Sequence, residues 1–156
     1  MSRLRKLISG GQSGVDRAAL DAARSAGLEI GGWCPAGRWA EDGSIPLDYP
    51  LDETPQADPG QRTAWNVRDA DATLILTRGR PRGGTAQTLE CAQAAGQPWL
   101  LVDLDTAASA PAIAAWLASV RPGTLNVAGP RESQAPGISE AVRGLLEVLL
   151  ASPDEP

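Results

Sequence analysis

The sequence predicts an α/β protein with a three-layer fold, in which helices cover both faces of a mostly parallel central sheet. Short apolar runs alternate with segments of helical periodicity along most of the chain. Residues 72–77 form an almost entirely apolar run, as expected of a parallel strand that is buried on both faces. Two of the apolar runs end in glycine-rich turns that open a helical segment, at residues 9–14 and 78–85.

The N-terminal part is expected to begin with a strand at residues 5–9. A helix at residues 14–26 follows, because its apolar side chains recur at helical spacing and Gly27 is a typical stop signal. A second strand is expected at residues 28–33. Residues 34–59 are rich in Gly, Pro and Asp and predict a long irregular segment. Loops of this length in a compact domain are usually functional or disordered, and we expect a functional loop here.

The C-terminal part alternates regularly between helices and strands. Helices are expected where apolar residues recur at helical spacing, at residues 61–71, 85–95, 109–120 and 137–150. Strands are expected at the apolar runs between them, at residues 72–77, 99–102 and 124–128, and a frayed tail at residues 152–156. Parallel strands joined by right-handed helical crossovers place their carboxyl ends at one edge of the sheet, where ligands bind in such folds.

Length and charge narrow the class of protein. A chain of 156 residues suits one domain, which we take as residues 1–156, a single ligand-binding domain. The formal net charge of −5 argues against a nucleic-acid binder, because such proteins are usually basic. No apolar run approaches the roughly 18 residues of a membrane span, and no signal peptide is visible at the start. We therefore expect a cytoplasmic protein that contacts neither nucleic acid nor membrane.

The absence of histidine limits the chemistry of the chain. Histidine is the commonest general base and the commonest metal ligand, and it forms half of most nucleophile pairs. Cys34 and Cys91 are far apart in the sequence and form no CxxC pattern, so both are expected to be packed thiols. A metal site built from protein ligands is therefore not expected.

The first glycine-rich turn reads SGGQSGVD and provides candidate ligand contacts at Gly10, Gly11, Gln12, Ser13, Gly14 and Asp16. Unpaired backbone N–H groups at a helix start lie at the positive end of the helix dipole and form a site for an anion such as phosphate. The turn matches neither the dinucleotide fingerprint nor a Walker A loop. The alternative is a structural turn, with Ser13 or Gly14 as the N-cap and Asp16 favoured by the helix dipole.

The second glycine-rich turn carries three arginines, and its candidate ligand contacts are Arg78, Arg82, Gly83, Gly84, Thr85 and Thr88. Thr85 is expected to be the N-cap of the helix that follows. Thirteen of the fourteen cations in the chain are arginines, which a GC-rich genome could explain, but codon usage does not explain this cluster. Arginine suits bidentate contact with phosphate. The alternative is a polar loop with solvated arginines.

The long segment at residues 34–59 supplies further candidates. Arg38 could reach a ligand, and Trp39 could stack on a planar ring. Glu41 and Asp42 are clustered carboxylates near a strand end, and they could act as acid and base or simply solvate the loop. We favour the solvating role. Arg131, after the last strand, could close the site.

Five segments fall in the order and spacing of a known family: SGGQSGVDRAALDAA, GGWCPAGRWAEDGSIP, NVRDADATLIL, RGGTAQTLECA and LNVAGPRES. Together they resemble the molybdenum carrier family, the molybdenum cofactor carrier proteins, from Ile8 to the terminal helix. That family is similar to a circularly permuted branch of the Lonely-Guy-like Rossmann superfamily, which includes phosphoribohydrolases and nucleotide sensors. The resemblance implies a Rossmann-like three-layer fold for the single domain of residues 1–156 and a homo-oligomer (a dimer or tetramer). It also implies the molybdenum cofactor (molybdopterin) as bound ligand and molybdoenzymes as partners.

The chain departs from the signature of the hydrolases, which resembles PGGxGTxxE. Here the sequence is RGGTAQTLE, with Arg82 in place of the proline and Ala86 in place of the third glycine. We therefore expect a carrier for the molybdenum cofactor or a related phosphorylated pterin or nucleotide, more than an enzyme. A nucleotide phosphoribohydrolase (N-glycosidase) using Glu41 or Asp16 and a nucleotide-sensing module stay as alternatives. Neither carboxylate suits a general base, because the helix dipole should keep Asp16 charged and Glu41 should be exposed.

Overall fold

The computed structural model describes residues 4–106 and 108–151, and its centre is a five-stranded sheet in the order β2-β1-β9-β7-β8. The strands are β1 (Lys6–Ile8), β2 (Glu29–Gly31), β7 (Ala72–Thr77), β8 (Trp99–Asp103) and β9 (Thr124–Ala128). Every pairing between them is parallel. The predicted α/β class with a mostly parallel sheet is therefore confirmed. The tail expected at residues 152–156 lies outside the described residues.

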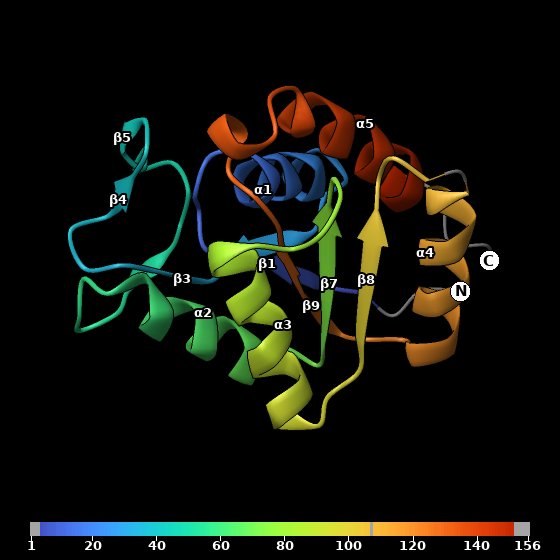
Figure 1. The fold of residues 1–156 in the computed structure, drawn as a ribbon, viewed down its shortest axis with the longest axis horizontal. Helices are drawn as coiled ribbons and strands as arrows, with labels where there is room; N and C mark the ends of the chain where they lie inside the picture. Colours follow the sequence, from blue (N-terminus) through green and yellow to red (C-terminus); the bar gives the residue numbers. More distant parts are fainter. Residues whose placement is uncertain (1–3, 107, 152–156) are drawn as a thin grey trace.

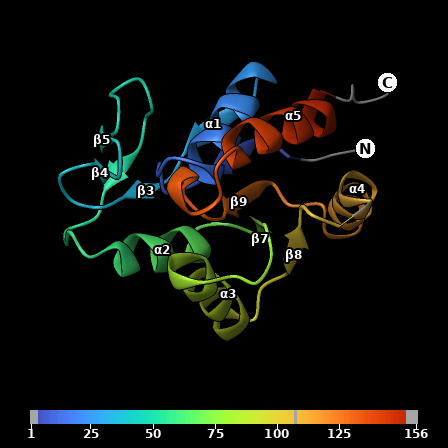
Figure 2. The ribbon, with the colours of Figure 1, turned by 45° about the horizontal axis from the view of Figure 1, so that its top comes forward.

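Helices cover both faces of this sheet, as the three-layer prediction requires (Figures 1 and 2). The helices are α1 (Val15–Ser25), α2 (Pro59–Arg68), α3 (Gly83–Ala95), α4 (Ser109–Val120) and α5 (Ile138–Ala151). In both views α1 and α5 lie together on one face, and α2 and α3 lie on the other. Helix α4 lies beside the edge strand β8 (Figure 1).

The apolar patterns of the sequence explain this packing. All six residues of β7 are buried, because the strand lies in the interior of the sheet with helices on both sides. Helix α1 buries a face of small side chains that includes Ala18, Ala19, Ala22 and Ala23, so it approaches both the sheet and α5 closely. Leu20 on the same helix is fully buried.

The strand expected at residues 28–33 is interrupted. Strand β2 ends at Gly31, and Gly32 has a φ of 127°, a backbone conformation that favours glycine. A Cβ on Gly32 would collide with the backbone of Ser9, so only glycine allows this close approach. The chain then leaves the sheet as β3 (Trp33–Cys34), which pairs in parallel with β6 (Asp52–Glu53).

The long segment after β3 is more ordered than the expected irregular loop. It contains the antiparallel pair β4 (Trp39–Ala40) and β5 (Gly43–Ser44), which projects from the body of the protein (Figure 1). Ile45 and Leu51 are buried and pack at the place that a side chain on Gly11 would occupy. The segment is therefore anchored against the first glycine-rich turn.

Helices α2 and α3 each begin two residues before the start that the sequence predicts. Helix α2 begins at Pro59, because the carboxylate of Asp58 accepts the N–H of Gly60 as a cap and proline suits the first helical position. The prediction of Thr85 as an N-cap is wrong. Arg82 is the N-cap of α3, and Thr85 lies buried in the first turn of the helix. A short 3-10 helix, η1 (Glu132–Gln134), was not expected.

Candidate functional site

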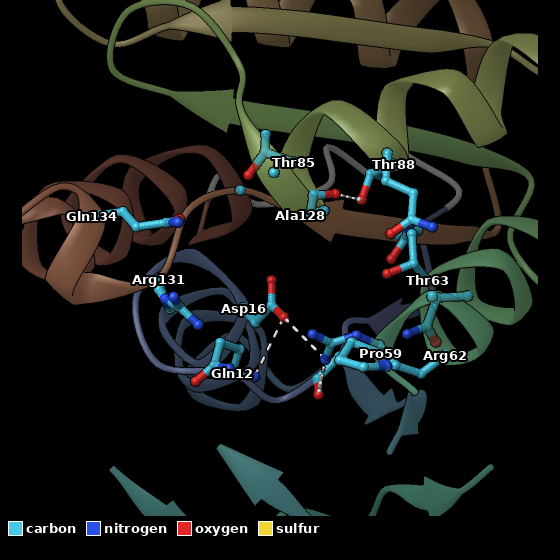
Figure 3. A pocket seen from close by; sticks show the side chains of 18 of the residues that line it. Gln12, Asp16, Pro59, Arg62, Thr63, Thr85, Thr88, Ala128, Arg131 and Gln134 are labelled. Atoms are coloured by element: carbon cyan, nitrogen blue, oxygen red, sulfur yellow. Dashed lines mark hydrogen bonds and ion pairs between the residues drawn. The ribbon is translucent and has the colours of Figure 1, made fainter. Parts of the chain in front are cut away.

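A pocket of about 400 Å³ opens between the carboxyl ends of β1 and β9 and the N-terminal ends of α2 and α3 (Figure 3). Helices α1 and α3 follow their strands onto opposite faces of the sheet, and a crevice at such a point is where ligands bind in these folds. Both glycine-rich turns reach the pocket. Seven of the predicted contacts line it, namely Gly10, Gln12, Asp16, Gly83, Gly84, Thr85 and Thr88.

The N–H groups of the first turn are already used within the chain. The amide of Gln12 donates to Oδ2 of Asp16 at 3.3 Å, and that of Gly11 donates to Oγ of Ser9 at 3.4 Å. The amide of Ser13 donates to Oε1 of Gln12 at 3.0 Å. A carboxylate of the protein therefore occupies the position at which the sequence suggested an external anion.

Ser13 and Gly14 hold the turn against the segment after β9. Gly14 is the N-cap of α1, and its φ of 80° favours glycine. A Cβ on Gly14 would collide with the backbone of Pro130 and Arg131. The hydroxyl of Ser13 accepts the N–H of Glu132 at 3.2 Å. These two predicted contacts do not line the pocket, and their observed contacts are structural.

The second turn is open toward the pocket. Within residues 4–106 and 108–151, no hydrogen-bond acceptor is found for the N–H of Gly83 or of Gly84. Both glycines are exposed and line the pocket at the positive end of α3. The hydroxyl of Thr88 donates to the carbonyl of Gly84 at 3.0 Å, which tightens the first turn of this helix. This helix start, and not that of α1, has free amides for an anion.

The arginine cluster of the second turn lies outside the pocket. Nη1 of Arg78 donates to Asp105 at 2.7 Å, on the outer surface. Arg80 and Arg82 are exposed. The guanidinium groups in the pocket wall belong instead to Arg62 and Arg131. Sequence reasoning named Arg131 but missed Arg62, because a single arginine in an ordinary helix pattern carries no motif.

Arg62 forms a buried contact with the first turn. Its Nη1 donates to the carbonyl of Gly10 at 2.9 Å and lies 3.9 Å from Oδ2 of Asp16 (Figure 3). The side chains are 14% and 9% exposed, respectively. Removal from water raises the pKa of Asp16 to about 6, and this outweighs the attraction of Arg62 and the Gln12 amide. The pKa of Asp16 is therefore raised, and not lowered as the prediction from the helix dipole requires.

Glu41 connects the projecting segment to the first glycine-rich turn and to the residues that follow β9. Its carboxylate accepts the hydroxyls of Ser13 and Ser133 and the amide of Ser133, and it lies 3.3 Å from Nε of Arg131. Hydrogen bonds from the two serine hydroxyls lower the pKa of Glu41. The side chain is 21% exposed, so the expected exposed loop position is wrong. Its lowered pKa does not suit a general base near neutral pH.

Arg38 organises the projecting segment and does not line the pocket. Its guanidinium donates to four carbonyls of that segment, those of Ile45, Pro46, Tyr49 and Leu51, at 2.9–3.2 Å. These hydrogen bonds satisfy backbone carbonyls that a neighbouring strand would satisfy in a regular sheet. The structure therefore gives Arg38 a place inside the loop, away from the predicted ligand. Trp39, next to it, lines the pocket and is 53% exposed.

Among residues 4–106 and 108–151, no three His, Cys, Asp or Glu side chains lie together in a way that could hold a metal ion. No helix in the same residues is long and apolar enough to cross a membrane. Cys34 is fully buried, and Cys91 is partly buried and also a free thiol.

Comparison with known proteins identifies the family. Residues 7–150 match the model of the circularly permuted YpsA SLOG family. The chain belongs to this family. It is also similar to a "putative molybdenum carrier protein" of Syntrophus aciditrophicus, whose crystal structure superposes with a TM-score of 0.93 at 44% identity. The similarity covers 96% of this chain and 97% of that one, so the resemblance seen in the sequence is confirmed. No curated protein sequence matches the chain.

Proposed function

We propose that this protein binds and carries a phosphorylated pterin or nucleotide, with the molybdenum cofactor as the leading ligand. The observation that carries the proposal is the pocket that joins the free amides of α3 to two arginines. The name of the similar Syntrophus protein supports a molybdenum-related cargo. In this proposal the metal is part of the cargo and arrives already bound to its pterin.

The phosphate would lie at the start of α3. The amides of Gly83 and Gly84 are free among the described residues, and they combine backbone donors with the positive end of the helix dipole. Arg131 lines the same pocket and would add a charge-assisted hydrogen bond. Arg82, the exposed N-cap residue of α3, could approach from outside.

The rest of the pocket suits a flat polar ring. A volume of about 400 Å³ falls within the range of small-molecule sites, roughly 300–1,000 Å³. Trp39 offers an exposed aromatic face at the pocket wall. Asp16, Asn66 and Asn126 are buried polar residues that line the pocket, where a heterocycle with several hydrogen-bonding atoms would contact them.

Native mass spectrometry of protein purified without oxygen from its own cells tests the proposal. We expect a bound species that contains phosphorus and molybdenum and releases a fluorescent pterin after oxidation. Arg131→Gln should weaken binding of the cargo by about tenfold or more, since a charge-assisted hydrogen bond contributes roughly 1.5–3 kcal/mol. Arg121→Gln removes the same charge from an exposed residue at the end of α4 and is the matched control. Protein that carries no such species, and takes up none from a molybdenum cofactor donor, would contradict the proposal.

A phosphoribohydrolase is the second candidate, because the structure gives it a better base than the sequence suggested. Asp16 is buried at the pocket wall with a pKa of about 6, a value suited to proton transfer near neutral pH. Incubation with AMP and GMP, followed by chromatography for free base, tests this activity. Base release that disappears in Asp16→Asn and persists in Glu41→Gln would favour the hydrolase over the carrier.

Two further expectations belong to the carrier proposal. A homo-oligomer, a dimer or tetramer, would be seen as a multiple of the 16.2 kDa chain mass in light scattering. A carrier must also release its cargo to an acceptor, for which molybdoenzymes are the expected partners. Transfer of the cofactor from the loaded protein to a cofactor-free molybdoenzyme, measured as recovered enzyme activity, would test that step.

A further inference from the structure

One oxygen of the Asp16 carboxylate is turned into the open pocket (Figure 3). The other oxygen, Oδ2, faces the protein, where it accepts the amide of Gln12 and lies near Nη1 of Arg62. No hydrogen bond to Oδ1 is found in the part of the chain that the structure describes. Asp16 is only 6% exposed, and its Oδ1 meets solvent through the pocket. A carboxylate oxygen that has no donor from the protein can accept one from a bound ligand.

Three polar side chains around Asp16 already have partners in the protein. Arg62 donates to the carbonyl of Gly10, and Arg131 forms an ion pair with Glu41, although no hydrogen-bond acceptor is found for its Nε among the described residues. The side-chain amide of Asn66 is used by the backbone of Trp33, once as donor and once as acceptor. The free oxygen of Asp16 is therefore available to a donor on the ligand.

We propose that Oδ1 of Asp16 selects the ligand by accepting the adjacent ring N–H and amino N–H groups of a 2-amino-4-oxopyrimidine ring, the edge that pterins and guanine share. This inference rests on the proposed function and adds a ligand class to it. One carboxylate oxygen has lone pairs for two donors, and this edge presents two donors side by side. Trp39 in the same pocket wall offers an aromatic face to the same flat ring.

The same contact discriminates against adenine. Adenine has a ring-nitrogen acceptor where guanine has the ring N–H, so its lone pair would face that of the carboxylate. A site built around a polar group rejects a ligand that leaves this group unpaired much more strongly than a hydrophobic site rejects a misfit. Burial of Asp16 strengthens this effect, because water cannot fill the gap freely. Hypoxanthine keeps the ring N–H but lacks the amino group, and its affinity should lie between the two.

Calorimetric titration with GMP, IMP and AMP tests this inference on the full chain. The wild type should bind GMP at least tenfold more tightly than AMP, with IMP between them. In Asp16→Asn the ratio between GMP and AMP should fall below about threefold, because the amide presents a weaker acceptor together with a donor. The control is Asp52→Asn, which removes an exposed carboxylate of β6 outside the pocket and should keep the wild-type ratio.

The outcomes separate this inference from the proposed function. Equal affinities for GMP and AMP in the wild type, or a preference that survives in Asp16→Asn, would overturn the role of Asp16 and leave the phosphate site standing. Tenfold weaker binding of 2′-deoxy-GMP than of GMP would overturn it as well, since Asp16 would then accept sugar hydroxyls. No binding of any of these nucleotides would contradict the proposed phosphate site together with this inference.

Discussion

The free energy of unfolding of Asp16→Asn, relative to that of the wild type, should rise as the pH increases from 4 to 8. In the folded protein, burial raises the pKa of Asp16 from 3.8 to about 6. The folded state therefore binds the proton more tightly than the unfolded chain does, and the free energy of unfolding falls as the pH rises through this interval. At about 1.4 kcal/mol per pKa unit, the charged carboxylate costs the wild type about 3 kcal/mol above pH 6, an order-of-magnitude value.

Urea unfolding of both proteins between pH 4 and pH 8 measures this cost. The difference in unfolding free energy between Asp16→Asn and the wild type should grow by about 2.4 kcal/mol from pH 4 to pH 8, most of it between the unfolded and folded pKa values. Glu41 and Asp42 have lowered pKa values and also make stability depend on pH. Their contributions are common to both proteins and cancel in the difference, as long as the urea m-values agree.

The reasoning is refuted by a difference that stays flat across this range. A variant that becomes less stable relative to the wild type as the pH rises would refute it more directly. That result would mean that attraction to Arg62 outweighs the cost of removing the carboxylate from water. Asp52→Asn should give a flat difference, because Asp52 lies exposed in β6.

Three further predictions concern the frame around the pocket. Gly129→Ala should lower the free energy of unfolding, measured in urea, by about 1–3 kcal/mol or more, because the new Cβ would collide with the carbonyl of Leu76 and with Val15. Gly144→Ala is the control, because open space surrounds Gly144 in α5. This variant should be neutral or more stable by up to about 1 kcal/mol. Arg38→Ala removes four hydrogen bonds to carbonyls, so limited proteolysis should cleave residues 34–59 faster than in the wild type. An unchanged cleavage rate would show that the segment stays folded without these hydrogen bonds. Arg82→Ala should weaken phosphate binding about tenfold in calorimetry, with little change in melting temperature. Arg78→Ala should weaken phosphate binding less, because Arg78 is paired with Asp105. Equal losses of affinity in the two variants would show that the loop acts only through its total charge.

The glycine-rich turns show how far sequence reasoning reached into the site. Both turns were expected at the carboxyl edge of the sheet, and both contribute to the pocket wall. The difference between them was not visible in the sequence, because it depends on which acceptors lie nearby. The side chains of Ser9, Gln12 and Asp16 accept the amides of the first turn, and this follows from the local path of the backbone. The amides of Gly83 and Gly84 have no such neighbour among the described residues.

The sequence by itself determined the order of the five strands of the central sheet and the five α-helices, because periodicity and glycine stops act over a few residues. It also determined the family, through motifs that cover nearly the whole chain. Only the tertiary structure decided that Arg62 faces the pocket while Arg38 and Arg78 do not. It also decided the acidity of Asp16. The position of each arginine and the pKa of Asp16 depend on burial and on contacts between segments that lie far apart in the chain. The spacing of residues along one segment shows neither burial nor these contacts.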